Sequence, residues 1–442
     1  MKVRIMTILL LMLLAVLPGC SAEKETSIPQ NEASGAVTLP NGAQSEAEYS
    51  PESPGADDDV SFGTGSDNTQ GERRAVWLSY LELQDLLSAD KAQTQKHLEN
   101  VFDNIDAMGL NTVIVQVRPF ADAIYKSSYF PWSHIITGTQ GQDPGYDPLQ
   151  LMIDLARERD LRIEAWINPY RVKTPTQTLD TDTIVYQWLM EQDGYVVTTQ
   201  GESGEAALSQ ALYLNPAIDE NQALILNGVK ELVQNYDIDA IHFDDYFYPT
   251  TDVVFDSKAY EKSGKELSLD DWRRNNVNTL IHKVYEAIKA IDENMEFGIS
   301  PQGNIDINYN KQYADVKYWI ENEGYLDYIM PQVYYGFKNS VPFAATVEEW
   351  ADLASQSDVD LCIGLAAYKI GQEDQWAGEA GMDEWIVDGG DLLKRQVEFC
   401  RDLQGDSCKG FALYNYGALF QPEQSVKELV EEEKENLKTI LK

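Results

Sequence analysis

Two adjacent carboxylates, Asp244 and Asp245, end a run of hydrophobic residues and are followed directly by aromatic residues and a proline. Carboxylates this close repel each other, and such a pair can share one proton, which is the arrangement that general acid chemistry needs. Successive side chains of a strand point to opposite faces, so a catalytic role for both requires the backbone to turn or bulge here. We predict that both are catalytic; the alternative is a structural role, such as helix capping or pairing with an arginine.

Polar side chains also stand at the ends of other hydrophobic segments, where a packed core would not place them. Tyrosine is common among them, and it offers a flat face for a sugar ring and a hydroxyl for its substituents, so carbohydrate is the predicted ligand class. Alternation within the segment 112–118 predicts that its two polar residues, at 116 and 118, share one face. The predicted substrate-binding residues are Gln116, Arg118, Asn168, Tyr170, Arg171, Tyr246, Ser300, Gln302, Gln332, Tyr334, Tyr335, Tyr414 and Tyr416.

Eight apolar segments alternate with eight amphipathic segments from residue 73 onward, which predicts an α/β fold with a (β/α)8 TIM barrel. An open sheet binds its ligand at one switch point, whereas a closed barrel gathers nearly all strand ends around one site, so seven polar ends favour the barrel. The predicted strands are 75–80, 112–118, 162–168, 240–244, 296–300, 328–332, 361–366 and 410–414. The predicted helices lie near 91–108, 148–159, 221–236, 270–291, 311–322, 346–355, 390–403 and 423–437.

The segment 172–214 is long for a connection between the third strand and its helix, and we predict that this insertion contains short structure on one side of the barrel mouth. Glu164 lies deep in the third strand, where a carboxylate paired with a neighbouring strand is the favoured interpretation. Asp239 and His242 are expected to fix the fourth strand. The chain has 4 histidines and no His-x-His or His-Glu-x-x-His spacing, so neither a metal site nor a cofactor is predicted.

The N-terminus carries two basic residues, an apolar run from 5 to 17, and Leu-Pro-Gly-Cys ending at Cys20. This pattern is a secretory signal, and its end resembles a bacterial lipoprotein box, which implies acylation of Cys20 and anchoring to the membrane outside the cytoplasm. An ordinary cleaved signal with a chance cysteine is the alternative. We predict a lipoprotein signal peptide at 1–20, a disordered acidic tether at 21–72 and the barrel at 73–442.

The net charge is −39, from 73 acidic and 34 basic residues. Binding to nucleic acid or to anionic lipid by charge alone is therefore not expected, and a carbohydrate or a neutral or cationic partner fits better. Besides Cys20, the chain has Cys362, Cys400 and Cys408, with no Cys-x-x-Cys spacing, and a disulfide between Cys400 and Cys408 is left open.

Seven motifs in order resemble the glycosyl hydrolase-like 10 family, also called the domain of unknown function 187 family. The resemblance runs from about residue 73 to about residue 420. It implies a TIM-barrel glycosidase, often secreted or lipid-anchored in bacteria, with peptidoglycan glycan chains as the suggested substrate. The motifs are residues 74–77, 111–119, 165–171, 214–216, 241–249, 298–301 and 331–335.

An adjacent acidic pair at this strand end is similar to the pattern in hexosaminidases and O-GlcNAcases, which use the 2-acetamido group of the substrate as nucleophile. That analogy implies that Asp244 orients the acetamide and that Asp245 acts as acid and base. The competing mechanism needs a second carboxylate about 5–9 Å away, for which Asp122, Asp306 and Glu373 in loops are candidates. A non-catalytic carbohydrate-binding protein is the alternative function, and an envelope scaffold would need an exposed apolar patch.

Overall fold

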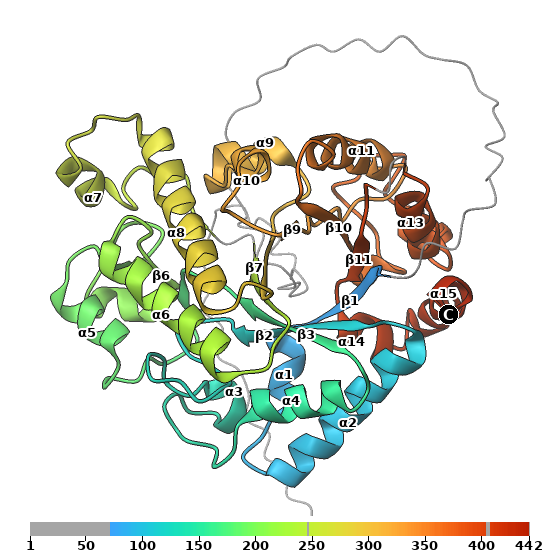
Figure 1. Ribbon diagram of the computed structural model, residues 1–442, viewed down its shortest axis with the longest axis horizontal. Coiled ribbons are helices and arrows are strands. Elements are labelled where there is room, and N and C mark those ends of the chain that lie inside the picture. Colours follow the sequence, from blue (N-terminus) through green and yellow to red (C-terminus); the bar gives the residue numbers. More distant parts are fainter. Residues whose placement is uncertain (1–70, 245–246, 404–406, 442) are drawn as a thin grey trace, which may run out of the picture. The chain divides into compact units, whose positions relative to one another are not determined.

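Eight parallel strands close into a barrel in the computed structural model, which describes residues 71–244, 247–403 and 407–441. Figure 1 shows the strands at the centre and helices around them. Each strand pairs in parallel with its neighbours in chain order, and β1 closes the ring on β11, so the predicted (β/α)8 barrel is confirmed. The barrel strands are β1 (Arg73–Leu78), β2 (Thr112–Arg118), β3 (Arg162–Ile167), β7 (Ala240–Asp244), β8 (Glu296–Ser300), β9 (Tyr328–Ile329), β10 (Asp360–Leu365) and β11 (Gly410–Leu413).

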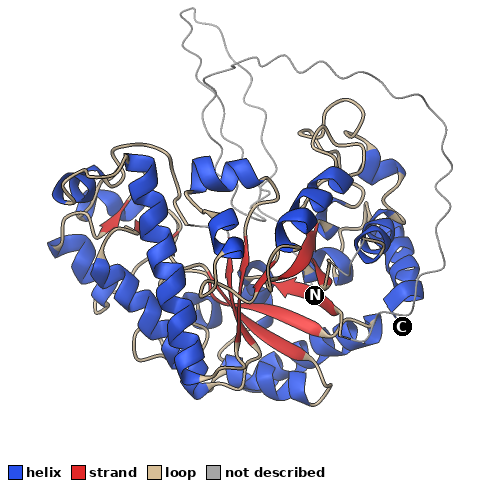
Figure 2. Ribbon diagram, turned by 45° about the horizontal axis from the view of Figure 1, so that its top comes forward, coloured by secondary structure: helices blue, strands red, loops and turns tan. Residues whose placement is uncertain are grey.

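The strands are apolar because both of their faces are covered, and every residue of β2 is buried. Helices pack on the outside, as Figure 2 shows, and polar residues define their ends. For α2, the Asp90 side chain accepts hydrogen bonds from the N–H groups of Ala92 and Gln93, and Gly109 at φ 88° ends the helix in a left-handed conformation. The helices are α1 (Tyr80–Leu86), α2 (Lys91–Met108), α3 (His134–Thr137), α4 (Pro148–Arg157), α5 (Ile184–Glu191), α6 (Asp219–Asn235), α7 (Ser257–Lys262), α8 (Leu269–Ile291), α9 (Ile305–Ile307), α10 (Val316–Glu321), α11 (Phe343–Ala354), α12 (Glu384–Val387), α13 (Leu392–Arg401), α14 (Tyr416–Phe420) and α15 (Lys427–Leu441).

Two predicted elements are much shorter in the structure, and each has a local reason. The sixth strand ends at Ile329, because Pro331 lacks the N–H that a continuing strand would donate. The helix expected at 311–322 begins only at Val316, because the chain first makes a π turn over Asn308–Gln312.

The insertion after β3 folds into a small sheet and a helix, as expected from its length. Strands β4 (Arg171–Lys173), β6 (Leu212–Leu214) and β5 (Val196–Val197) pair in that order as an antiparallel sheet. Helix α5 lies between β4 and β5 in the chain. A second excursion, containing α7, follows β7, and the two lie at the same side of the barrel in Figure 1.

The barrel interior contains a chain of buried polar side chains. The Glu164 carboxylate pairs with Arg73 Nε at 3.0 Å and accepts a hydrogen bond from the Tyr328 hydroxyl at 2.8 Å. His242 Nδ1 lies 2.8 Å from that hydroxyl, and Trp77 Nε1 donates to His242 Nε2 at 3.4 Å. Burial and then the Arg73 charge lower the pKa of His242 to about 3, so this histidine is neutral. The expectations that Glu164 is a paired interior carboxylate and that His242 fixes its strand are confirmed.

The predicted leader, Cys20 and almost all of the predicted tether fall outside the described residues, as do Asp245 and Tyr246. Within residues 71–244, 247–403 and 407–441, no helix is both long and apolar enough to cross a membrane. Cys362, Cys400 and Cys408 carry free thiols, and a hydrogen bond with Cys408 together with burial raises the pKa of Cys400.

Candidate active site

Asp244 lies at the carboxyl end of β7 and is held from two sides by amide groups. Asn168 Nδ2 donates to Asp244 Oδ2 at 3.2 Å, and Gln332 Nε2 donates to Asp244 Oδ1 at 2.9 Å. The Asp244 side chain is buried, with 5% of the residue surface exposed. Hydrogen bonds from buried amides fix the rotamer of a carboxylate, so Asp244 is presented in one orientation at the barrel mouth.

The amide that holds Asp244 is itself oriented by a relay that crosses three strand ends. The N–H of Tyr80 donates to Gln116 Oε1 at 2.8 Å, which leaves the Gln116 amide nitrogen to donate to Asn168 Oδ1. Asn168 Oδ1 is thereby an acceptor, and its Nδ2 must face Asp244. On the other side, Gln332 Nε2 also lies 3.3 Å from Ser300 Oγ. Gln116, Asn168, Ser300 and Gln332, four of the predicted substrate-binding residues, are therefore brought together around Asp244.

Aromatic rings line the neighbouring part of the mouth. The rings of Tyr334, Tyr368 and Tyr414 form a mutual cluster with centroid separations of 5.8 to 5.9 Å, and Trp77 lies 5.8 Å from Tyr414. Burial, and then the carboxylates of Glu82 and Asp244, raise the pKa of Tyr414 well above its usual range. Tyr414 is therefore a neutral phenol close to Asp244, and the structure brings Tyr334 and Tyr414, two of the predicted substrate-binding residues, into one largely buried cluster of rings.

The loop that follows Asp244 is anchored to α8 by a buried ion pair. Arg273 Nε donates to Asp256 Oδ2 at 2.9 Å, and both residues are buried. Arg273 also donates to the carbonyl of Asp252 at 2.8 Å and to the Tyr313 hydroxyl at 2.9 Å. This anchor fixes the described segment from Asp252 to Asp256 against α8, and it was not anticipated from the sequence.

We call Asp244 with Gln116, Asn168, Ser300 and Gln332 the Asp244 network. Arg118 lies outside it. β2 shifts register against β3 between Gln116 and Arg118, which interrupts the strict alternation on which the prediction of a shared face rests. The guanidinium lies 4.3 Å over the Phe130 ring, and its Nε and one terminal nitrogen have no hydrogen-bond partner among the described residues. Burial lowers the pKa of Arg118 to about 10.

Other predicted substrate-binding residues are placed in different surroundings. Tyr416 is fully buried in the helix layer, where its hydroxyl accepts a hydrogen bond from Asn104 Nδ2 at 2.9 Å. Tyr170 is also buried, and burial raises the pKa of its hydroxyl. Arg171 lies 4.8 Å over the Phe120 ring.

Gln302 follows the fifth barrel strand, β8, and Tyr335 follows the sixth, β9; both residues are half-buried. Gln302 forms an isolated parallel bridge with Gln332. Burial, with a contribution from the carboxylate of Asp374, raises the pKa of Tyr335.

Asp374 belongs to a polar contact that the sequence did not reveal. Lys369 Nζ donates to Asp374 Oδ2 at 2.6 Å and to the Tyr334 carbonyl at 2.8 Å. The pair holds the loop after β10 against the tyrosine cluster. The sequence gives little indication of this ion pair, because a lysine and an aspartate five residues apart in a loop are not a recognisable motif.

The loop carboxylates considered as a second catalytic group do not join the Asp244 network. Asp122 is fully buried, and its Oδ2 pairs with His134 Nδ1 at 2.9 Å. Asp306 is exposed on the short helix α9, and Glu373 is exposed on a loop. Of the residues that the structure describes, Asp244 is the one carboxylate in the network, and no cluster of three or more His, Cys, Asp or Glu residues suited to a metal ion is found among them.

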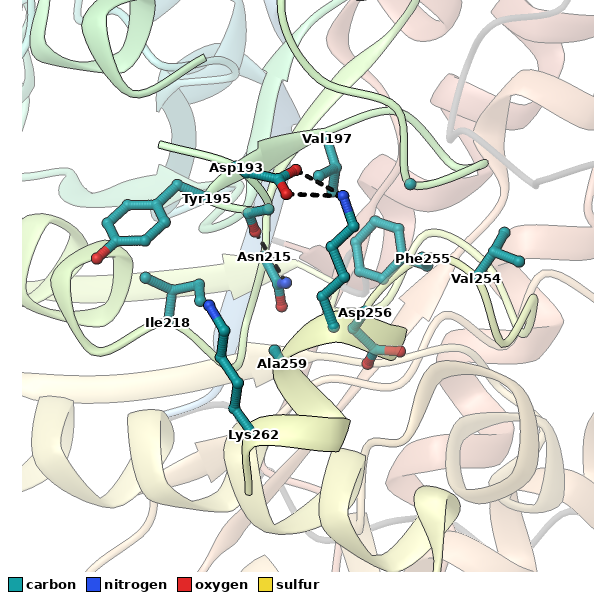
Figure 3. A pocket seen from close by; sticks show the side chains of 13 residues that line it. Asp193, Tyr195, Val197, Asn215, Ile218, Val254, Phe255, Asp256, Ala259 and Lys262 are labelled. Carbon is teal, nitrogen blue, oxygen red and sulfur yellow. Dashed lines mark hydrogen bonds and ion pairs between the residues drawn. The ribbon is translucent and has the colours of Figure 1, made fainter. Parts of the chain in front are cut away.

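The insertion after β3 and the segment after β7 meet at a small cavity of about 40 Å³, shown in Figure 3. Lys258 Nζ reaches both carboxylate oxygens of Asp193, at 2.8 and 2.7 Å, but this exposed pair contributes little. Asn215 is buried, donates from Nδ2 to the Gly194 carbonyl at 3.0 Å, and accepts from the N–H of Ala217. The Leu-Asn-Pro motif at 214–216 therefore has a structural role, which is to close the insertion.

This chain is similar to proteins named as glycosyl hydrolases. It is 39% identical over 331 residues to the glycosyl hydrolase YngK of Bacillus subtilis, a match that covers 69% of this chain and 62% of that protein. It is 34% identical over 355 residues to the glycosyl hydrolase DigH of Escherichia coli, covering 74% of this chain and 79% of that protein. The chain thus spans less than two thirds of the length of the Bacillus relative.

Solved structures show the same fold at low sequence identity. The glycoside hydrolase domain of PgaB (BpsB) from Bordetella bronchiseptica superposes with a TM-score of 0.52 at 13% identity, covering 81% of this chain and 98% of that one. An endo-1,4-beta-mannanase from Rhizomucor miehei gives 0.51 at 11% identity, covering 84% and 94%. The family model glycosyl hydrolase-like 10 matches residues 72–378. From the seven motifs, the closed barrel and this match, the chain belongs to the glycosyl hydrolase-like 10 family.

Proposed function

We propose that this protein is a glycoside hydrolase that cleaves an N-acetylated polysaccharide of the cell envelope, with peptidoglycan glycan chains as the substrate. The observation that carries the proposal is the Asp244 carboxylate, held by Asn168 and Gln332 beside three clustered tyrosines at the barrel mouth. A carboxylate fixed in this way is preorganised to act on a bound sugar, and the rings supply its stacking surface. The relatives named as glycosyl hydrolases support the same reaction class.

The proposed mechanism is substrate-assisted. Asp244 would accept a hydrogen bond from the acetamide N–H of the substrate and orient its carbonyl oxygen toward the anomeric carbon. Asp245 would donate a proton to the leaving glycosidic oxygen and then take one from the attacking water. The competing mechanism needs a second carboxylate about 5–9 Å from the acid. Asp122, a candidate for that group, is paired with His134 and does not join the Asp244 network, which supports the substrate-assisted route.

The test is product analysis by mass spectrometry on peptidoglycan, with and without peptide stems, in heavy-oxygen water. The label would appear at the new reducing end, identifying the bond cleaved. Asp245→Asn should abolish turnover, and Asp244→Asn should lower it by several orders of magnitude. The control is Asp306→Asn, which changes an exposed carboxylate of the short helix α9 and should leave turnover unchanged. Circular dichroism would verify that each variant is folded.

Full activity of Asp245→Asn would refute the assigned mechanism. Binding of the glycan by the unsubstituted protein without any new reducing ends would refute hydrolysis and favour a non-catalytic carbohydrate-binding protein.

We also propose that the protein is anchored outside the cytoplasm by acylation of Cys20. The support is the basic, apolar and Leu-Pro-Gly-Cys succession at the N-terminus. Labelled palmitate should be incorporated into the unsubstituted chain and not into Cys20→Ala. Equal labelling of both, or absence of label in both, would contradict the anchor.

A further inference from the structure

A groove of about 720 Å³ lies outside the Asp244 network, on the side of the barrel where β2 and β3 end. Three segments form it: the loop after β2 at residues 127–132, the start of the insertion at 180–188, and the first turns of α6 at 220–227. These segments all follow the carboxyl ends of barrel strands or begin the next helix, so the groove opens on the same side of the barrel as the mouth. None of its lining residues has a role in the proposed reaction.

The walls of the groove are fixed by buried contacts. Glu231 of α6 accepts a hydrogen bond from the N–H of Ser128 at 2.6 Å and one from the Ser127 hydroxyl at 2.5 Å. Phe130 packs so closely on α6 that a Cβ at Gly228 would lie 2.5 Å from its ring. The loop after β2 is therefore pinned to α6, and the shape of the groove does not depend on a mobile surface loop.

A second contact joins the loop after β2 to the insertion. Gln140 accepts a hydrogen bond from the N–H of Asp180 at 2.7 Å and donates to Asp122 Oδ2 at 3.3 Å. Trp188 is held by an edge-to-face contact with Tyr195 at 5.8 Å. Both walls thus present their side chains to the groove in defined positions, which lowers the ordering cost of binding.

The lining combines aromatic rings with carboxylates. Tyr129, with 42% of its surface exposed, and the half-buried Trp132 and Trp188 supply flat apolar faces. Asp180, Asp182 and Glu220 supply hydrogen-bond acceptors, and no Lys, Arg or His stands among the described residues that line the groove. Stacking faces beside acceptors suit a sugar, whose C–H face packs on rings and whose hydroxyl groups donate to carboxylates. The charge of the lining excludes an anionic ligand.

We propose that this groove is a second saccharide-binding site, which takes a saccharide chain without negative charge. The inference rests on the proposed function only in taking a saccharide as the ligand class. The acidic N-terminal segment of this chain, which contains Asp57-Asp58-Asp59, is disfavoured as an occupant because its charge has the same sign as that of the lining. The site would hold a glycan strand on the protein surface in addition to the strand at the mouth.

The test uses the β-1,4-linked N-acetylglucosamine hexamer as probe, in an Asp245→Asn background that prevents turnover. Hydrogen–deuterium exchange of this protein should show protection of 127–132 and 184–188 on adding the hexamer. Calorimetry should resolve two binding events, of which the double variant Tyr129→Ala with Trp188→Ala loses one or weakens it by roughly tenfold. The matched control is Trp376→Ala, which removes a tryptophan that is 85% exposed outside the groove and should leave both events intact.

A hyaluronan hexasaccharide, which alternates the same acetamido sugar with a carboxylate sugar, should not protect the groove segments. Protection by hyaluronan would overturn the charge argument. The proposal is also overturned if the hexamer leaves 127–132 and 184–188 unprotected, or if a lysine-rich peptide protects them and the hexamer does not. Groove protection in a protein that releases no reducing ends from peptidoglycan would support the second site while refuting the proposed hydrolysis.

Discussion

Replacing Asn168 by aspartate should make the stability of the protein depend on pH in a predictable way. Asn168 Nδ2 lies 3.2 Å from Asp244 Oδ2, so Asn168→Asp exchanges a hydrogen-bond donor for a carboxyl group at the same distance. The new group keeps its acceptor role toward Gln116, because Asn168 Oδ1 already accepts from that amide. The substitution therefore changes mainly one interaction, the one with Asp244.

The size of the repulsion between the introduced carboxylate and that of Asp244 follows from the distance between them. Two like charges about 4 Å apart repel by about 4 kcal/mol at an effective dielectric constant of about 20, which corresponds to about three pKa units. The introduced carboxyl group should thus have a pKa well above the value of about 3.9 that it has in the unfolded chain. A group whose pKa is raised on folding destabilises the native state as pH rises above the unfolded value. Between about pH 4 and pH 7 the variant should lose about 4 kcal/mol relative to the parent.

Urea denaturation of both proteins across this pH range measures the difference. Asn168→Ala serves as a reference, because it removes the hydrogen bonds without adding charge and should cost about 2–4 kcal/mol with little dependence on pH. Asn310→Asp adds a carboxyl group at an exposed position and controls for the change in net charge. If the destabilisation by Asn168→Asp is the same at pH 4 and pH 7, the close contact with Asp244 is refuted.

Three further substitutions test other parts of the fold. Burial raises the pKa of Glu433 to about 8, so the parent should lose stability as pH rises from about 5 to 8, and Glu433→Gln should remove that loss of a few kcal/mol in chemical denaturation; parallel pH profiles would contradict this. Burial lowers the pKa of His242 to about 3, so the parent should lose stability as pH falls below about 6.5, where the histidine of the unfolded chain takes a proton. In thermal melts the variant His242→Gln should lose less stability over the same pH range, and an equal loss in both proteins would contradict this. At Gly298 a Cβ would lie 2.0 Å from the Tyr328 ring, so Gly298→Ala should cost about 1–3 kcal/mol or more by calorimetry, and an unchanged melting temperature would show that the ring can move.

The order of elements was predictable because hydrophobic periodicity reports it directly. Strands 112–118, 240–244 and 296–300 have the predicted ends, and helix 91–108 does as well. Sequence periodicity failed where a local irregularity decides the direction of a side chain. The register shift of β2 between Gln116 and Arg118 interrupts the alternation, and no glycine or other turn-forming residue in the segment 112–118 marks it.

The sequence also did not reveal contacts between residues that lie far apart in the chain. Arg273, on helix α8, and Asp256, in the segment after β7, are 17 positions apart and become partners only when that segment packs on α8. Tyr416 shows the opposite error, since a tyrosine just past a strand end was expected at the mouth and instead lies under α2. The end of a strand fixes where the backbone of the next residues lies. The turn that follows decides whether their side chains face the mouth or the helix layer.

The Asp244 network depends on the order of the strands in the barrel, which no single segment of the sequence reveals. β2, β3 and β7 are consecutive neighbours, so amides and a carboxylate at their ends come within reach of one another across strands about 4.8 Å apart. Gln332 instead follows β9, and β8 lies between it and Asp244. The intervening strand ends in Ser300, whose short side chain leaves Gln332 Nε2 free to pass at 3.3 Å from its hydroxyl and to bond Asp244 at 2.9 Å. A small residue at the end of β8 is therefore as necessary to the orientation of Asp244 as the amides that hold it.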